Sequence, residues 1–124
     1  MSLYEEIGGK PAVDAAVDIF YDKILADNSI NYFFTDMNMR QQRMKMKLFL
    51  YYALGGEGQY SGKDLRSSHK DLNLTDDHFN SVGKHLKETL EELSVKPSII
   101  DQLLAVVEST RDDVLNRPSS RKTA

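Results

Sequence analysis

One continuous helical pattern, from Met39 to Leu54 (MRQQRMKMKLFLYYAL), organises the chain. The segment contains no Gly or Pro and is dominated by Met, Arg, Gln, Lys and Leu, which favour helices. Spacing of i, i+3, i+4, i+7, i+8 and i+11 places six residues on one face. Most of that face is apolar, but its first turn is polar where a plain core helix would carry Leu or Val. The face consists of Gln42, Lys45, Met46, Phe49, Leu50 and Ala53.

A second helical pattern precedes this segment. Residues 1–9 form a short lead-in that Gly8-Gly9 interrupts, because paired glycines adopt backbone angles that other residues avoid. Pro11 suits the first turn of a helix that extends to about Ala26. Tyr21 lies in its apolar stripe, and taken alone is a core tyrosine with its hydroxyl at the rim. Residues 30–34 follow as a short helical segment. The stripe comprises Val13, Ala16, Val17, Phe20, Tyr21, Ile24 and Leu25.

The C-terminal half is also helical in pattern. Residues 57–62 are expected to form a loop, and residues 63–72 a short helix with Leu65, His69 and Leu72 on one face. Thr75 is predicted to cap a helix that ends near residue 93, and a last helix begins at Pro97 and extends to residue 114. The inward sets are Phe79, Val82, Leu86, Leu90 and Leu93, then Ile99, Ile100, Leu103, Leu104, Val107 and Val114.

These patterns predict the fold class. No β pattern and no internal repeat is present, so we expect an all-α protein. The 124 residues suffice for one domain with one core. We place that domain at residues 1–117 and expect the polar residues 118–124 to be a disordered tail.

Composition and charge exclude several classes of function. The formal net charge is −3 and the isoelectric point about 5.6, with no basic run, which argues against nucleic acid as a partner. No apolar run approaches the length of a membrane span, and the acidic start lacks the regions of a signal peptide. The chain has no cysteine, which excludes disulfides and thiolate chemistry. A cytoplasmic location fits this composition.

The candidate chemistry centres on His69, which shares an apolar face with Leu65 and Leu72. A lone histidine in such a place is more often a satisfied core residue than a metal ligand. A flat apolar cofactor with a central metal would need a wall that is polar only over the metal, as the 39–54 helix provides. A neutral imidazole could then bind the metal from the opposite side.

Each candidate residue also has a plain structural interpretation. Lys45 could lay its methylenes on the core with its amine in water, and Met46 could fill a core gap. His78 and His85 are seven residues apart on one helix, too distant to chelate one metal, and are expected at the surface. These structural interpretations become less convincing when the residues are considered together, because Tyr21, His69 and the polar turn of the 39–54 helix all face inward. No nucleophile elbow, phosphate-binding glycine loop or HExxH motif competes with this site.

In its motifs the chain resembles a group I truncated haemoglobin of the cyanobacterial, algal and ciliate type. The matching stretches are LYEEIGG, AVDIFYDKIL, the FF of NYFFTDMNM, MRQQR…FLYYALGG, YSGKDLRSSHKDLNL, HFN…LKETLEEL and DDVLNR. They cover roughly residues 2–117 in the order of the family. Two glycine pairs, a helical tyrosine, a phenylalanine pair and a downstream histidine recur at consistent spacing.

The resemblance implies a two-over-two helical sandwich around non-covalent haem b. It implies that His69 is the proximal iron ligand and that Tyr21 is the distal tyrosine that hydrogen-bonds bound oxygen. The remaining positions that it implies around the haem are Phe34 on the porphyrin, Gln42, Lys45 and Met46 on the distal side, and Phe49, Leu50 and Leu65 as contacts.

The chain departs from the cyanobacterial members of that family at three positions. At the position of Lys45, the best-known of these members have a histidine that binds iron as a sixth ligand. Some algal relatives have a lysine there, as this chain does. Met46 replaces a glutamine, so a second distal amide is missing. Some cyanobacterial members have, near the position of Thr110, a histidine that can bond covalently to a haem vinyl group. Thr110 cannot form that bond.

The resemblance implies reversible binding of O2, with NO and CO as further diatomic ligands, by a monomer. When gas is absent, the sixth iron position could be occupied by Lys45 or less readily by Met46; an open or water-bound iron is the alternative. An enzymatic alternative is nitric oxide dioxygenation, which requires an external reductase because the chain has no flavin or nicotinamide motif. A small helical interaction domain is the alternative if the protein takes up no haem.

Overall fold

The computed structural model describes residues 2–55, 69–70 and 72–117. In this part of the chain the regular elements are all helical, so the predicted all-α class is confirmed. The expected loop at residues 57–62, most of the expected 63–72 helix and the 118–124 tail lie outside the described residues. No helix among the described residues combines the length and the apolar character needed to cross a membrane.

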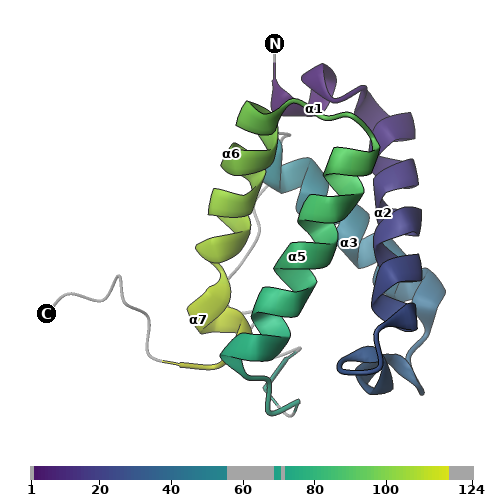
Figure 1. The fold of residues 1–124 in the computed structure, drawn as a ribbon, viewed down its shortest axis with the longest axis vertical. Coiled ribbons are helices and arrows are strands. Elements are labelled where there is room, and N and C mark those ends of the chain that lie inside the picture. Colours follow the sequence, from purple (N-terminus) through teal and green to yellow (C-terminus); the bar gives the residue numbers. More distant parts are fainter. Residues whose placement is uncertain (1, 56–68, 71, 118–124) are drawn as a thin grey trace, which may run out of the picture.

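Four longer helices form two crossed pairs (Figure 1). Helix α2 contacts α3 in one pair and also α5, which packs against α6 in the other pair. Short elements connect or flank the four. Their bounds are α1 Leu3–Glu6, α2 Gly9–Ala26, η1 Asn31–Phe34, α3 Met39–Ala53, α5 Asp76–Glu92, α6 Pro97–Glu108 and α7 Arg111–Val114.

Side-chain capping explains where three of the helices begin. Asn38 accepts a hydrogen bond from the Gln41 amide at the start of α3. Thr75 caps α5 as predicted: its hydroxyl oxygen accepts from the His78 amide at 3.3 Å. At the N-terminus, Ser2 and Glu5 form a reciprocal capping box that starts α1, a short helix within the expected lead-in.

The last predicted helix is interrupted, contrary to the expectation of one helix to residue 114. Helix α6 ends at Glu108 and α7 begins at Arg111. The hydroxyl of Ser109 donates to the Val106 carbonyl at 2.5 Å, and that of Thr110 to the Val107 carbonyl at 2.6 Å. Such side-chain bonds compete with the helical backbone pattern, which accounts for the break.

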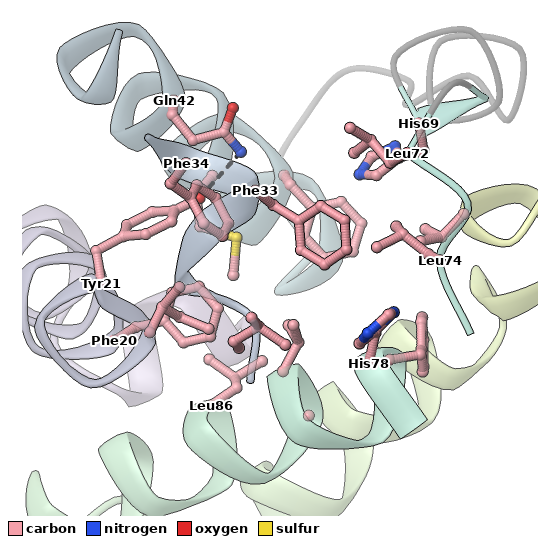
Figure 2. A pocket seen from close by; sticks show the side chains of 18 of the residues that line it. Phe20, Tyr21, Phe33, Phe34, Gln42, His69, Leu72, Leu74, His78 and Leu86 are labelled. Carbon is pink, nitrogen blue, oxygen red and sulfur yellow. Dashed lines mark hydrogen bonds between the residues drawn. The ribbon is translucent and has the colours of Figure 1, made fainter. Parts of the chain in front are cut away.

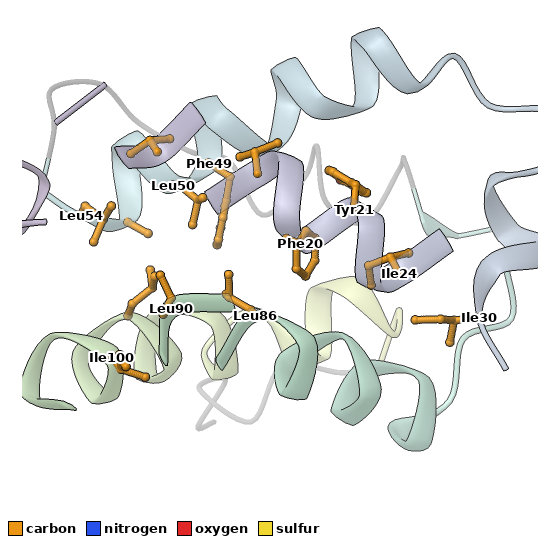
Figure 3. Packing of buried hydrophobic residues seen from close by; sticks show 14 residues of the cluster. Phe20, Tyr21, Ile24, Ile30, Phe49, Leu50, Leu54, Leu86, Leu90 and Ile100 are labelled. Atoms are coloured by element: carbon orange, nitrogen blue, oxygen red, sulfur yellow. The ribbon is translucent and has the colours of Figure 1, made fainter. Parts of the chain in front are cut away.

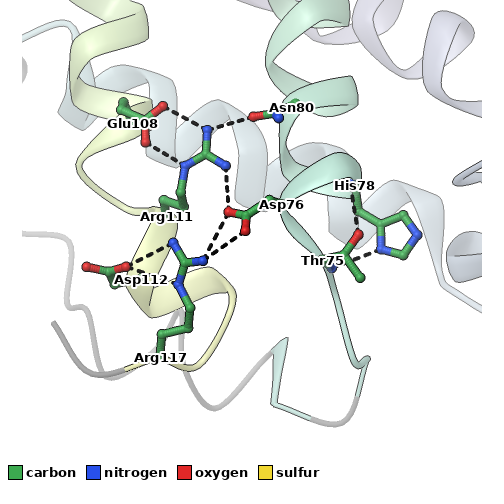
Figure 4. Close-up of polar contacts among 8 residues, drawn as sticks. All are labelled: Thr75, Asp76, His78, Asn80, Glu108, Arg111, Asp112 and Arg117. Atoms are coloured by element: carbon green, nitrogen blue, oxygen red, sulfur yellow. Dashed lines mark hydrogen bonds and ion pairs between the residues drawn. The ribbon is translucent and has the colours of Figure 1, made fainter. Parts of the chain in front are cut away.

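Two arginines hold α7 against the start of α5 (Figure 4). The Arg111 guanidinium pairs with Asp76 at 3.0 Å and lies 4.4 Å from the centroid of the Phe79 ring. Arg117 pairs with both Asp76, at 3.0 Å, and Asp112, at 3.2 Å. The direction of α7 is therefore fixed by side chains from another helix.

The core lies between the two pairs of helices (Figure 3). Its residues come mainly from the predicted inward stripes. Leu25, predicted to belong to the stripe of α2, is exposed instead, because it lies on the outer side of the last turn of that helix. The core cluster consists of Val13, Val17, Phe20, Tyr21, Ile24, Ile30, Phe49, Leu50, Ala53, Leu54, Leu86, Leu90, Ile100 and Leu103.

His85 ties α5 to the end of α2, so its expected surface position is wrong. Its side chain is only 15 % exposed, and Nε2 lies 2.7 Å from Oδ2 of Asp27, the residue that ends α2. The other oxygen of Asp27 accepts from the hydroxyl and amide of Ser29, at 2.7 and 2.9 Å. The Ser29 hydroxyl and then His85 lower the pKa of Asp27 to about 2.

Because the folded pKa of Asp27 is lowered, its ionised form stabilises the fold. This stabilisation is complete above the ordinary carboxyl pKa of about 3.9 and is lost as the pH falls through about 2. We expect Asp27→Asn to lower Tm at pH 5, and the difference from the wild type to narrow between pH 4 and pH 2. Thermal unfolding followed by circular dichroism measures this. Asp101→Asn, at an exposed position on α6, is the control, and a constant difference for Asp27→Asn would contradict the role of its charge.

Candidate functional site

A cavity of about 310 Å3 opens between the two pairs of helices (Figure 2). Residues from α2, η1 and α3 form one wall, and the other consists of His69, Leu72, Leu74 and residues from α5, from α6 and from the chain that follows α6. The lining is predominantly apolar, with a few polar side chains that converge on the space. The polar members of the lining are Tyr21, Gln42, Lys45, His69, His78 and Thr110.

Tyr21 and Gln42 form a polar pair on the α2–α3 wall. Tyr21 is 2 % exposed, and its hydroxyl oxygen accepts a hydrogen bond from Gln42 Nε2 at 3.1 Å. The Tyr21 ring packs edge-on against Phe20 at 5.0 Å and Phe34 at 6.0 Å, measured between ring centroids. This hydroxyl therefore lies inside the cavity wall, not at the rim that the sequence alone suggests for a core tyrosine.

Arg43 contacts the same tyrosine from outside the cavity. Its guanidinium carbon lies 5.9 Å from the centroid of the Tyr21 ring, and Nη1 pairs with Asp18 at 2.6 Å. The ring is thus held by aromatic neighbours, by Gln42 and by a cation over its face. Little rotation remains available to Tyr21.

His69 lies on the wall opposite Tyr21. In Figure 2 its ring is turned towards the cavity, beside Leu72 and across from Tyr21 and Gln42. The His69 carbonyl accepts from the Leu72 amide at 3.1 Å. Leu65, expected on the same face, lies outside the described residues.

Other residues singled out from the sequence occupy different parts of the site. Phe34, Met46 and Phe49 line the cavity on the side of Tyr21. Lys45 also lines it, although this residue is exposed. Leu50 does not appear in the lining and instead lies in the core between the helices.

His78 is a lining residue that the sequence placed at the surface. It is half-buried, and its Nδ1 accepts from the Thr75 amide at 3.1 Å. That bond leaves Nε2 to carry the proton in the neutral ring, and Nε2 lies 3.4 Å from the Tyr32 hydroxyl. The signal in the sequence is the capping spacing T-x-x-H, which fixes the ring beside the start of α5.

The chemistry of the lining fits an iron porphyrin. Such a group is flat and apolar with two carboxylates at one edge, and its iron would need one further ligand from the protein. The cavity offers apolar walls, one histidine facing a phenol–amide pair, and polar side chains from Lys45 and His78. Among the described residues, no three His, Asp or Glu side chains gather as a site for a bare metal ion.

Comparison with known proteins agrees with this chemistry. The model of the bacterial-like globin family matches residues 2–116. A group 1 truncated hemoglobin from Chlamydomonas moewusii is 50 % identical over 119 residues, covering 94 % of this chain and 70 % of that protein.

Two crystal structures extend the similarity to three dimensions. The 2/2 hemoglobin from Synechococcus sp. PCC 7002, in the cyanomet state with covalently attached heme, has a TM-score of 0.89 and 44 % identity, covering 94 % of this chain and all of that one. The truncated hemoglobin from Tetrahymena pyriformis in its Fe(III) form has a TM-score of 0.85 and 39 % identity, covering 93 % and 98 %. The chain belongs to the bacterial-like globin family, within the truncated haemoglobins that bind haem and gaseous ligands, and its cofactor is haem b.

Proposed function

We propose that the protein reversibly binds O2, and also NO and CO, at a haem iron that His69 ligates from the proximal side. The observation that carries this is the Tyr21–Gln42 pair, which lies across the cavity from His69. When bound, haem supplies an iron with an open sixth position for a diatomic ligand. The protein supplies the axial imidazole, the apolar walls and the distal hydrogen-bond donors.

Tyr21 and Gln42 provide those donors. Because Gln42 donates to the Tyr21 oxygen, the phenolic proton of Tyr21 can be directed at a ligand in the cavity. A diatomic ligand that gains negative charge on binding is stabilised most by donors in a pocket from which water is excluded. The rings of Phe20 and Phe34 help to exclude water, since both pack edge-on against the Tyr21 ring.

Lys45 has two possible partners at the mouth of the cavity. As a neutral amine it would bind iron when no gas is present, and as an ammonium in water it would pair with a carboxylate of the porphyrin. His78, which lines the cavity, and Tyr32, whose hydroxyl lies 3.4 Å from His78 Nε2, would offer further donors to such a carboxylate. We favour Lys45 over Met46 as the sixth ligand; its amine would bind the metal only after losing its proton.

We propose that haem is held without a covalent bond, because the position of Thr110 cannot provide one. This residue lines the cavity, but its hydroxyl donates to the Val107 carbonyl at 2.6 Å. A threonine offers no imidazole for reaction with a haem vinyl group. We expect all haem to be extracted from the protein by acidified organic solvent.

Tyr21→Phe removes the donor and leaves the ring. We expect O2 to dissociate about 10- to 100-fold faster, since a hydrogen bond to a charged group contributes about 1.5–3 kcal/mol. Stopped-flow displacement of O2 by CO measures the rate. Tyr51→Phe, on the outer side of α3, is the matched control. An unchanged rate in Tyr21→Phe would remove Tyr21 from the proposal.

Lys45→Ala tests the sixth iron position. We expect the ferric wild type to become increasingly low-spin as the pH rises, because an ammonium must lose its proton before it can bind the metal. The Lys45→Ala variant should remain high-spin in absorption spectra across the same pH range, and Met46→Leu should behave as the wild type. High-spin spectra in all three proteins would mean that the distal site is open.

The alternative use of the site is nitric oxide dioxygenation. This reaction would use the same residues as reversible binding. It would differ in requiring one electron for each turnover, because the iron would be left ferric at the end of the reaction. Continuous NO consumption in the presence of an electron donor would favour this function, and a single stoichiometric reaction would favour reversible binding. Both uses need ferrous iron, so both depend on a reductant outside the chain.

A further inference from the structure

The outer side of α3 carries an exposed apolar stripe. Its four residues follow at i, i+4, i+7 and i+8, which places them on one side of the helix, away from the buried Phe49. Solvent-facing positions of a helix are ordinarily polar. The exposed fractions are 56 % for Met44, 59 % for Leu48, 36 % for Tyr51 and 39 % for Tyr52.

Basic residues flank this stripe. Helix α3 has four arginines and lysines and no Asp or Glu, whereas α5 and α6 each carry more acidic than basic residues. Arg43 and Lys47 pair with Asp18 and Asp14 of α2, and Arg40 and Lys45 are exposed. Among the described helices, α3 is thus the one with a net positive charge in a chain of formal charge −3.

We propose that the outer side of α3, defined by Met44, Leu48, Tyr51, Tyr52 and Arg40, is the docking surface for an acidic protein that donates an electron to the haem. Tyr, Met and Arg are enriched in the centres of protein interfaces. An acidic partner would be attracted to α3 and repelled by α5 and α6, so the charge asymmetry orients its approach.

The surface is also close to the site that it would serve. Gln42, Lys45 and Met46 of the same helix line the cavity, so one helix, about 10–12 Å in diameter, separates donor and cofactor. The inference rests on the proposed function, because that function needs ferrous iron. In the step itself the donor loses one electron, the ferric iron gains it, and no bond is formed or broken.

Other occupants fit the charges or the geometry less well. A second copy related by two-fold symmetry would bring the basic α3 helices against each other. A membrane-surface helix buries its most apolar side in lipid, whereas Phe49, Leu50 and Ala53 are buried in the core of this protein.

The test measures reduction of the ferric haem protein by an acidic plant-type [2Fe–2S] ferredoxin in its reduced form, by stopped flow. We expect the second-order rate constant to fall with increasing salt, and to be about tenfold lower in Leu48→Glu and in Arg40→Glu. Gln102→Glu, which adds the same charge to α6 as Leu48→Glu adds to α3, should stay within about twofold of the wild type. Reduction by dithionite, which needs no docking surface, should be equal in all four proteins.

Equal ferredoxin rates in Leu48→Glu and the wild type would overturn the inference. It would also be overturned if Leu48→Glu abolished dimer formation in sedimentation, or binding to phosphatidylserine vesicles, without slowing reduction by ferredoxin. A protein that takes up no haem would refute the proposed function and this inference together. A haem protein that binds O2, but whose reduction is insensitive to Leu48 and Arg40, would refute this inference alone.

Discussion

The packing of α2 against both α3 and α5 is the contact on which the rest of the structure depends. One side of α2 supplies Val17 and Phe20 to the core between the helix pairs, and Tyr21 supplies a polar group to the cavity. A helix shared by two neighbours fixes their separation, and that separation leaves room for a flat cofactor. The small core and the large cavity therefore have the same origin, which explains why so short a chain can enclose haem.

Much of this arrangement was accessible from the sequence, because the signals are local and strong. The apolar stripes of the longer helices predicted their buried sides, and Pro97 and Thr75 predicted where two of them begin. The half-polar side of α3 and the apolar position of His69 predicted a site between them. These features depend on helical periodicity and capping, which operate within a few residues.

The features that the sequence did not reveal depend on long-range contacts or on competing local bonds. His85 appeared as a surface residue because its partner Asp27 is 58 positions away in the chain. His78 was misplaced because the turn at η1 brings Tyr32 and Phe33 beside it. The break after α6 arises from two hydroxyl groups that could equally have faced solvent.

The charge distribution follows a different logic from the packing. Neither the paired Lys47 nor the exposed Arg40 is needed to form α3, since many residues favour helices equally. The sequence of α3 therefore meets two requirements: its inner side must pack in the core, and its apolar, basic outer side must suit the partner proposed to bind there. The functional information in α3 is therefore not confined to the residues that face the cavity.

The attachment of α7 has a consequence for the cavity itself. Thr110, which precedes α7, and Val114, at its end, both line it. The position of α7 is held by Asp76 through Arg111 and Arg117, at the opposite end of the helix pair from the α5–α6 turn. The width of an apolar chamber is thus set by ion pairs in water, and salt or acid that weakens those pairs acts on the interior from outside.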